Sequence, residues 1–229
     1  MKTRLAIVAL CLATLNGILA QEASNSFALT QQGVVVDYAI SAKKINKVEL
    51  LAYARLTISN VKTNDNETTI IYNFDGLNKK KKPLGGNSSV EQTLTVTDGV
   101  ILFESDPLMN PGNYRTSHEG FAFKIPSALS IGDKIESGVV KEKAKFPMSK
   151  EIENIVQYDD FYVTGEEDVS TNAGIFHCYK IEGMLNGSFQ TEPLVMTNYA
   201  IWFSPKIGIV KIETEYFNET LVIDSVVGL

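Results

Sequence analysis

The stretch Leu94-Thr95-Val96-Thr97-Asp98-Gly99-Val100-Ile101-Leu102-Phe103 decides the fold class of this chain. Residues 94–97 and 100–103 are mainly β-branched, apolar or aromatic, which is typical of β-strands. Between them, Asp98-Gly99 readily adopts the positive φ angles that a two-residue hairpin turn requires. The stretch therefore predicts a tight β-hairpin and, with it, an antiparallel sheet.

Similar strand-like segments recur along most of the chain. They are residues 34–40, 53–61, 68–74, 121–125, 161–164, 175–181, 198–203, 208–217 and 221–226. All seven prolines fall between the segments, as expected for a residue that cannot donate a hydrogen bond to a sheet. Residues 175–181 are largely apolar on both faces, whereas residues 208–217 alternate between apolar and polar, a mixture that fits a sheet curved around a core or a cavity.

These patterns predict a mainly β protein: a single domain built on a curved, mostly antiparallel sheet or half-barrel, with at most one or two short helices. The best helix candidate is the segment Met148–Tyr158, in which Ile152, Ile155 and Val156 have helical spacing.

The first twenty residues have the pattern of a cleavable export signal. Lys2 and Arg4 precede the apolar run Leu5–Leu15, and the small residue Ala20 stands before the expected cleavage point. A lipoprotein anchor at Cys11 is the rival interpretation, but Leu10 is too large for the residue beside such a cysteine. The apolar run is too short for a transmembrane helix, which needs about 20 residues.

Cleavage would leave residues 21–229, which we expect to form one exported domain in the periplasm, at the cell surface or outside the cell. The whole chain is 44% hydrophobic and 21% charged, with a net charge of −6. This composition excludes a disordered chain and a disulfide scaffold, and its acidic balance argues against nucleic acid as a partner. Cys178 would remain as a lone cysteine, which its apolar neighbours predict to be buried and inert.

The sequence contains no nucleophile elbow, zinc-protease motif, phosphate loop or dinucleotide fingerprint. His118 and His177 are its two histidines, and neither has a second metal ligand at a diagnostic spacing. His177 and Cys178 are adjacent in a strand, so their side chains should point to opposite faces and form no dyad. We therefore predict a non-enzymatic protein with no catalytic, cofactor-binding or metal-ligating residues and with no cofactor.

Charged clusters leave alternatives open. Asp65-Asn66-Glu67, Asp159-Asp160 and Glu166-Glu167-Asp168 could bind Ca²⁺ or supply the carboxylates of a glycoside hydrolase, although acidic loops usually face water. The four lysines Lys79–Lys82 could contact lipid headgroups, acidic glycans or an anionic partner. Their ordinary interpretation is a solvated loop tip between strands.

Two segments of the second half resemble the bacterial TapB family. Val169-Ser170-Thr171-Asn172-Ala173-Gly174-Ile175-Phe176-His177-Cys178-Tyr179-Lys180-Ile181 is similar to its V-x-V-P-A-G-T-F-x-C-Y-K-I segment. Trp202-Phe203-Ser204-Pro205-Lys206-Ile207-Gly208-Ile209-Val210-Lys211 is similar to its W-Y-A-P-x-V-G-L-V-K segment. The chain departs from the family at Asn172, where the family has proline, and at Ile175, where it has threonine.

The resemblance covers residues 162–211 most specifically and Pro126–Asp133 weakly. It implies a TapB-like domain over residues 21–229, exported to the envelope of a Gram-negative bacterium, with a predominantly antiparallel β architecture. The family has no agreed biochemical activity. Its shared residues also have structural roles: Ala173-Gly174 makes a compact turn, and Trp202 supplies a large apolar side chain.

Three functions fit these observations. The first is a non-enzymatic binding or structural module whose partner is an unknown envelope protein. The second is a carrier of a lipophilic ligand in the half-barrel, and the third is a carboxylate-based hydrolase with two acids facing one pocket. A carrier requires an unfilled apolar cavity, whereas a structural module fills that space.

Overall fold

The structure of the chain, a computed structural model, describes residues 28–45, 47–84, 89–105, 115–145, 150–189, 192–215 and 218–228. The predicted export signal, residues 1–20, lies outside the described residues. In the described part, a single turn of 3₁₀-helix (η1, Ala28–Thr30) precedes a succession of strands. No helix in that part has the length and apolar character needed to cross a bilayer.

The strands are β1 (Val35–Lys44), β2 (Lys47–Asn64), β3 (Glu67–Leu77), β4 (Ser89–Thr97), β5 (Val100–Phe103), β6 (Arg115–Gly120), β7 (Phe123–Pro126), β8 (Glu136–Ser137), β9 (Val139–Ala144), β10 (Ile152–Thr171), β11 (Gly174–Phe189), β12 (Glu192–Ser204), β13 (Gly208–Thr214) and β14 (Glu219–Val227). They form one 14-stranded sheet in the order β6-β9-β10-β11-β12-β13-β14-β1-β2-β3-β4-β5-β7-β8. Every pairing is antiparallel, which confirms the predicted fold class.

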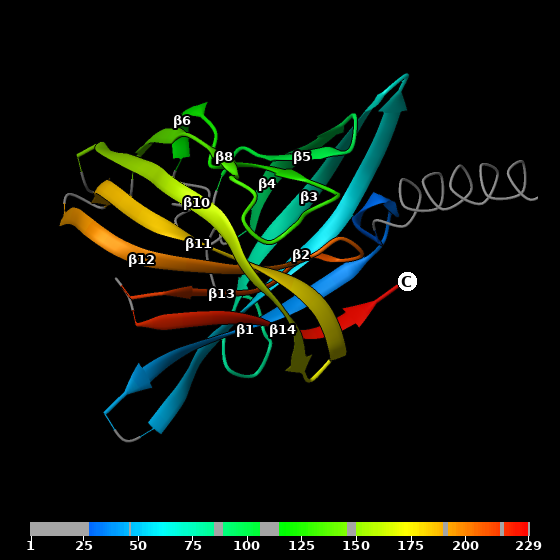
Figure 1. Ribbon diagram of the computed structural model, residues 1–229. Helices are drawn as coiled ribbons and strands as arrows, with labels where there is room; N and C mark the ends of the chain where they lie inside the picture. The colour runs from blue at the N-terminus through cyan, green and yellow to red at the C-terminus, as the bar shows by residue number, and fades with distance from the viewer. Residues whose placement is uncertain are drawn as a thin grey trace, which may run out of the picture.

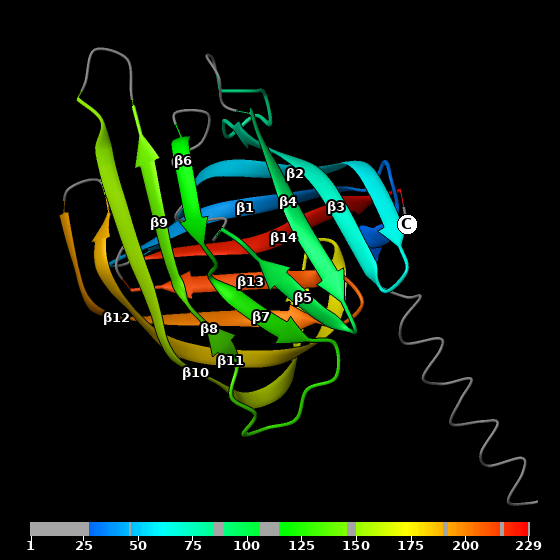
Figure 2. The same ribbon diagram turned by 90° about the horizontal axis from the view of Figure 1, so that it is seen from above.

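The sheet curls around a common interior (Figures 1 and 2). Its edge strands β6 and β8 do not pair with each other. Instead, the segment 132–138 bonds to the middle of β10: Gly132 N donates to Val163 O (2.8 Å), Ile135 N to Phe161 O (2.9 Å), and Tyr158 N to Gly138 O (2.9 Å). The β7–β8 end of the sheet is thereby joined to β10.

Aromatic side chains fill the interior where the two ends of the sheet meet. The Phe123 ring packs edge-on against Tyr158 at 4.7 Å and against Phe161 at 4.9 Å, centroid to centroid. Tyr199 completes the group, and both Phe161 and Tyr199 are almost fully buried. Edge-on packing of this kind adds to the stabilisation from burial alone.

The predicted hairpin at residues 94–103 is confirmed. Thr97 pairs with Val100, and the two turn residues have positive φ angles, 49° at Asp98 and 75° at Gly99. By contrast, the helix predicted at Met148–Tyr158 is wrong. Residues 146–149 lie outside the described part, and Ile152 begins β10.

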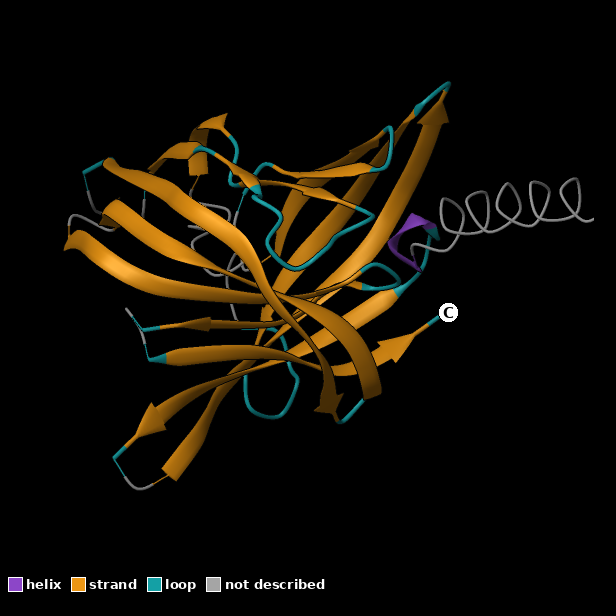
Figure 3. Cartoon of the chain, viewed as in Figure 1, coloured by secondary structure: helices purple, strands orange, loops and turns teal. Residues whose placement is uncertain are grey.

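The side chains of this segment explain the error. Asn154, Val156 and Tyr158 are buried while their neighbours are more exposed, so the period that matters is two residues. The helical spacing of Ile152, Ile155 and Val156 was a coincidence within a strand that pairs with β9 and β11. Figure 3 shows that strands dominate the described chain.

The hairpin of β10 and β11 extends beyond its neighbours and folds over the outer face of the sheet, where it approaches β14 (Figure 1). Ile201 and Phe203 point into the interior, so Trp202 between them points outward, yet it is only 4% exposed. Its indole Nε1 donates to Glu167 of the hairpin, and Lys211 Nζ lies 4.0 Å from its ring centroid. Trp202 is therefore a buried anchor, as predicted, but on the outer face.

Gly183 of β11 provides a test of the interior packing. A Cβ at this position would lie 2.5 Å from the Phe161 ring and 2.8 Å from the Asp159 carbonyl oxygen. We expect Gly183→Ala to lower the free energy of unfolding by about 1–3 kcal/mol, because the overpacked ring must move. Gly165→Ala is the matched control on the same hairpin, since nothing lies within 4 Å of its added Cβ. Equal midpoints for the two variants in urea denaturation would contradict this account of the core.

Candidate functional site

The two segments that carry the sequence resemblance meet in space and line one cleft. The β10–β11 hairpin contributes Asp168 and the run from Ile175 to Tyr179 except Cys178, and the β12–β13 turn contributes Ser204–Ile207. Gln31, just after η1, completes the wall of this cleft of about 790 Å³. We call it the hairpin cleft. Sequence reasoning identified both segments but could not place them side by side.

Local backbone chemistry shapes both walls of the hairpin cleft. At the hairpin tip, Ala173 N donates to Thr171 Oγ1 (3.0 Å), and Thr171 Oγ1 donates to the Gly174 carbonyl (3.0 Å). In the opposite turn, Ile207 N donates to Ser204 O (3.2 Å), and Gly208 has a φ of 85°, which favours glycine.

The hairpin cleft combines exposed apolar surface with charge. Ile175, a large aliphatic side chain that the cleft presents to solvent, is 71% exposed. His177 Nδ1 lies 3.1 Å from Asp168 Oδ1, and its Nε2 lies 3.7 Å from Glu166 Oε2. The imidazole is therefore held between two carboxylates at the mouth of an apolar cleft, an arrangement suited to binding a ligand with both apolar and polar groups.

Cys178 takes no part in this surface. It is buried, as predicted, and its thiol donates to the Phe176 carbonyl (3.3 Å). Burial, with smaller contributions from the carboxylates of Asp168 and Glu167, raises the pKa of the Cys178 thiol to about 12. Because the thiolate is the reactive form, this cysteine is inert near neutral pH.

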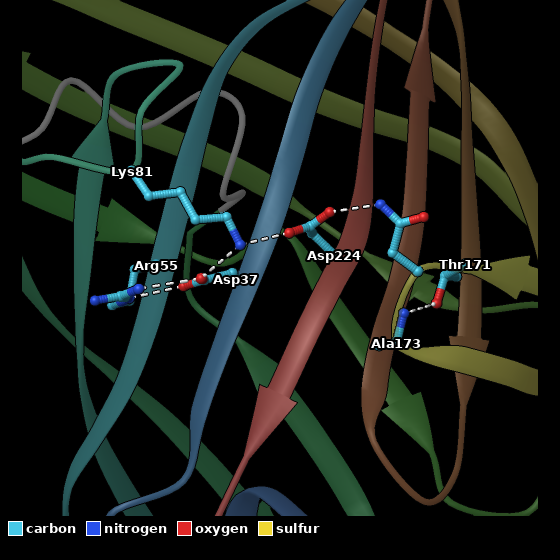
Figure 4. A network of polar contacts seen from close by, with 7 residues as sticks. Asp37, Arg55, Lys81, Thr171, Ala173 and Asp224 are labelled. Atoms are coloured by element: carbon cyan, nitrogen blue, oxygen red, sulfur yellow. Dashed lines mark hydrogen bonds and ion pairs between the residues drawn. The ribbon is translucent and has the colours of Figure 1, made fainter.

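A network of charged and polar groups holds the hairpin tip on the outer face (Figure 4). Arg55 of β2 binds Asp37 of β1 through two hydrogen bonds of 2.7 and 3.1 Å. Lys81 Nζ lies between two carboxylates, 3.2 Å from Asp37 and 2.5 Å from Asp224 of β14. Asn172 at the hairpin tip donates to the other oxygen of Asp224 (2.7 Å). The network thus joins β2, β1, the loop after β3, β14 and the hairpin.

The pKa values of Asp37 and Asp224, the two acids of this network, are both lowered. Burial pushes the pKa of Asp37 upward, but hydrogen bonds and charge from Arg55 and Lys81 outweigh it and leave the pKa below its usual value. Burial likewise opposes the effect of Lys81 and Asn172 at Asp224, whose pKa is also lowered. Both side chains are therefore ionised at neutral pH, and each faces a cation.

Lys81 corrects the ordinary interpretation of the lysine run. The residue has a φ of 56° and turns its side chain onto the sheet, where it is only 34% exposed. Lys79 contacts Glu49 at 3.4 Å, whereas Lys80 and Lys82 are exposed, as a solvated loop predicts. The sequence could not show which of four identical side chains would bend inward.

Two other hollows exist in the described part. One is a polar groove of about 560 Å³ whose lining includes Glu182, Glu213, Glu215 and Glu219. Burial raises the pKa of Glu219, whereas hydrogen bonds from Lys180 and Thr164 lower that of Glu182. The other is an apolar cavity of about 30 Å³ in the interior, lined by side chains such as Tyr38, Leu56 and Phe103.

The two histidines lie on different strands and contact different carboxylates. His118 of β6 lies 3.2 Å from Glu142, whereas His177 of β11 contacts Asp168. No group of three or more metal-ligating side chains occurs among the residues the structure describes. The acidic clusters predicted from the sequence are separated from one another. Asp160 contacts Lys134 at 3.6 Å, Glu167 accepts a hydrogen bond from Trp202, and Asp65 lies in the turn between β2 and β3.

Sequence reasoning missed Asp37, Arg55 and Asp224. A signal for Asp37 was present, since it stands alone in the apolar run Val34-Val35-Val36-Asp37-Tyr38. A lone acid in such a strand must be either on the wet face or paired. Its partners lie 18 and 44 residues away, and pattern alone could not identify them.

Two solved structures share this fold. One, from Bacteroides fragilis, is described as a "putative exported protein with YmcC-like fold"; it has a TM-score of 0.68 and 17% identity, over 87% of this chain and 97% of its own. The other, from Parabacteroides distasonis, is described as a "putative lipoprotein"; it has a TM-score of 0.68 and 13% identity, over 86% of this chain and 96% of its own. At these identities the likeness shows the fold alone.

No curated protein matches the sequence significantly. A family model, DUF3108-like, matches residues 31–226. That span takes in every strand apart from the last residue of β14, as well as both segments of the hairpin cleft. The chain therefore belongs to the DUF3108-like family.

Proposed function

We propose that this chain is an exported envelope protein that acts as a non-enzymatic binding module, with the hairpin cleft as its binding site. The observation that carries the proposal is the exposure of Ile175 inside a cleft of about 790 Å³. This volume falls in the range of about 300–1,000 Å³ that is typical of ligand sites. The export pattern of residues 1–20 and the resemblance to the TapB family support the location.

The partner that the hairpin cleft fits best is a segment of another envelope protein. The apolar surface of Ile175 and Phe176 would receive apolar side chains. His177, Asp168 and Lys206 would bind polar groups at the rim. Such a division between an apolar centre and a polar rim is typical of protein interfaces.

A rigid site supports this role. The hairpin wall is fixed by the Asn172–Asp224 and Trp202–Glu167 hydrogen bonds, and the Ala173 turn closes its tip. A site that is formed before binding loses less conformational entropy when the partner arrives.

The interior supports a structural core rather than a lipid carrier. The apolar cavity measures about 30 Å³, against roughly 10–15 Å³ on the same measure for a cavity that holds a single water molecule. An acyl chain would need many times this space. So small a cavity favours an interior filled by side chains, which supports a binding or structural module.

Of the three hollows described above, the polar groove has the most carboxylates in its lining, which makes it the candidate site of a carboxylate-based hydrolase. Three of its acids have partners there or nearby: Glu182 contacts Lys180 at 2.7 Å, Glu213 contacts Lys211 at 2.6 Å, and Glu215 accepts from Asn198 at 2.9 Å. Carboxylates held by neighbouring cations and amides suit a solvated surface better than acid–base chemistry.

Photo-crosslinking tests the hairpin cleft. A photoreactive amino acid replaces Ile175, and the same substitution at Ile131, which is 63% exposed on another loop, serves as the control. We expect a discrete crosslinked envelope protein from position 175 and none from position 131. The band should weaken at least about tenfold when His177→Ala and Lys206→Ala are added, because the rim contacts are lost. Equal crosslinking from both positions would refute the proposal.

The loop lysines provide a second test. We expect Lys81→Ser to lower the free energy of unfolding by about 1–3 kcal/mol, because it leaves the carboxylates of Asp37 and Asp224 facing each other without their shared cation. Lys80→Ser is the matched control in the same loop and should change stability by less than about 0.5 kcal/mol. Chemical denaturation measures both. A Lys81 variant as stable as the Lys80 variant would show that the network does not contribute to the stability of the fold.

The pH dependence of stability follows from the same network. The folded pKa values of Asp37 and Asp224 lie below the ordinary value of 3.8, so the network stabilises the folded chain above that pH. This stabilisation should stay constant from pH 7 to about pH 5 and disappear as the pH falls through the folded pKa values. Denaturation at several pH values should show a smaller acid loss for Lys81→Ser than for the native sequence. Parallel curves would contradict the assignment.

A further inference from the structure

The hairpin between β1 and β2 projects away from the rest of the sheet, at the lower left of Figure 1. Its end carries two large aliphatic side chains in water: Ile45 is fully exposed, and Val48 is 70% exposed. Removing either side chain from water would be favourable. Such exposure at the most distant point of a hairpin suggests a surface that is covered when the protein works.

Lysines surround this apolar end. Lys44 and Lys47 flank Ile45 in the sequence, and the loop after β3 brings Lys79 within 3.4 Å of Glu49 on β2. Glu49 also contacts Lys44 at 2.6 Å and Lys47 at 3.9 Å, so one carboxylate faces three ammonium groups. Lys80 and Lys82 of the same loop are exposed and add further positive charge.

The turn at the opposite end of β2, which leads to β3, is acidic. It carries Asp65 and Glu67, both exposed, and no large aliphatic side chain. The chain as a whole has a net charge of −6. The positive charge beside Ile45 is therefore a local feature, opposite in sign to the protein as a whole.

We propose that this basic tip, formed by Lys44, Ile45, Lys47 and Val48, docks on the surface of an anionic phospholipid bilayer. Lys44 and Lys47, which flank Ile45 in the sequence and are exposed, bind phosphate groups, while Ile45 enters the boundary between headgroups and acyl chains. Few apolar side chains take part, so the contact is weak and reversible. It is independent of the hairpin cleft, which is formed by other strands.

Vesicle cosedimentation tests the proposal with protein purified after export. The probes are vesicles of phosphatidylethanolamine with phosphatidylglycerol and vesicles of phosphatidylcholine alone. Binding should occur only to the anionic vesicles and weaken with added salt. Lys44→Gln with Lys47→Gln should weaken binding by about 5- to 25-fold, since each lysine near an anionic surface contributes about a fivefold factor in affinity. Ile45→Ser should weaken it by about tenfold or more.

Matched controls isolate the basic tip. Lys141→Gln with Lys143→Gln removes two exposed lysines from β9, and Ile131→Ser removes an exposed isoleucine elsewhere. Both controls should bind as the native protein does.

Failure to bind anionic vesicles, or equal loss in the tip and control variants, would overturn the proposal. Two further results would overturn it in favour of other occupants. Binding that resists Ile45→Ser and also occurs with soluble polyphosphate would indicate a soluble polyanion. A dimer in sedimentation velocity that Ile45→Ser dissociates would indicate a second copy of the chain.

Discussion

The shared use of β10 is the constraint on which the rest of the structure depends. This strand pairs with β11 along most of its length and with β9 over residues 152–157, and its middle also bonds to the segment that contains β8. The last contact turns an open sheet into a curled one and brings Phe123 onto Tyr158 and Phe161. Irregular pairing between Asp159 and Tyr162 accompanies the change of partner, since a bulge bends a strand and redirects its side chains. Without this junction, the aromatic group would face solvent.

On the outer face of the sheet, side chains are buried by the β10–β11 hairpin. This hairpin covers Trp202, and Asn172 fixes its tip to β14. The side-chain amide of Asn172 donates this bond to Asp224, so the hairpin is tied to β14 by a side chain rather than by the backbone. Asp224 can accept this bond while it holds Lys81, because its two oxygens are used separately.

The sequence predicted the features that depend on local periodicity and failed where distant segments meet. The turn at Asp98-Gly99 was predicted correctly because it depends on the φ angles of these two residues alone. The helix predicted at Met148–Tyr158 was wrong because Ile152, Ile155 and Val156 satisfy a helical period by chance, whereas pairing with β9 and β11 decides the backbone. Within the site, both walls of the hairpin cleft were visible as motifs, but their contact was not. The Lys81 partners are contributed by strands at opposite ends of the chain, and charge alone does not identify them.

Because the interior cavity is small, the surface is the better place for a binding site. The apolar cavity lined by side chains such as Tyr38, Leu56 and Phe103 measures about 30 Å³, so the curled sheet serves as a rigid frame. Rigid frames position distinct surfaces independently, and here the hairpin cleft and the basic tip lie on different hairpins of one sheet. The tip's chemistry suits a membrane surface, while the cleft's mixture of Ile175 and the His177–Asp168 pair suits a protein segment. A protein that rests weakly on a bilayer while its cleft remains accessible would present that cleft to partners diffusing along the same surface, where confinement raises their effective concentration.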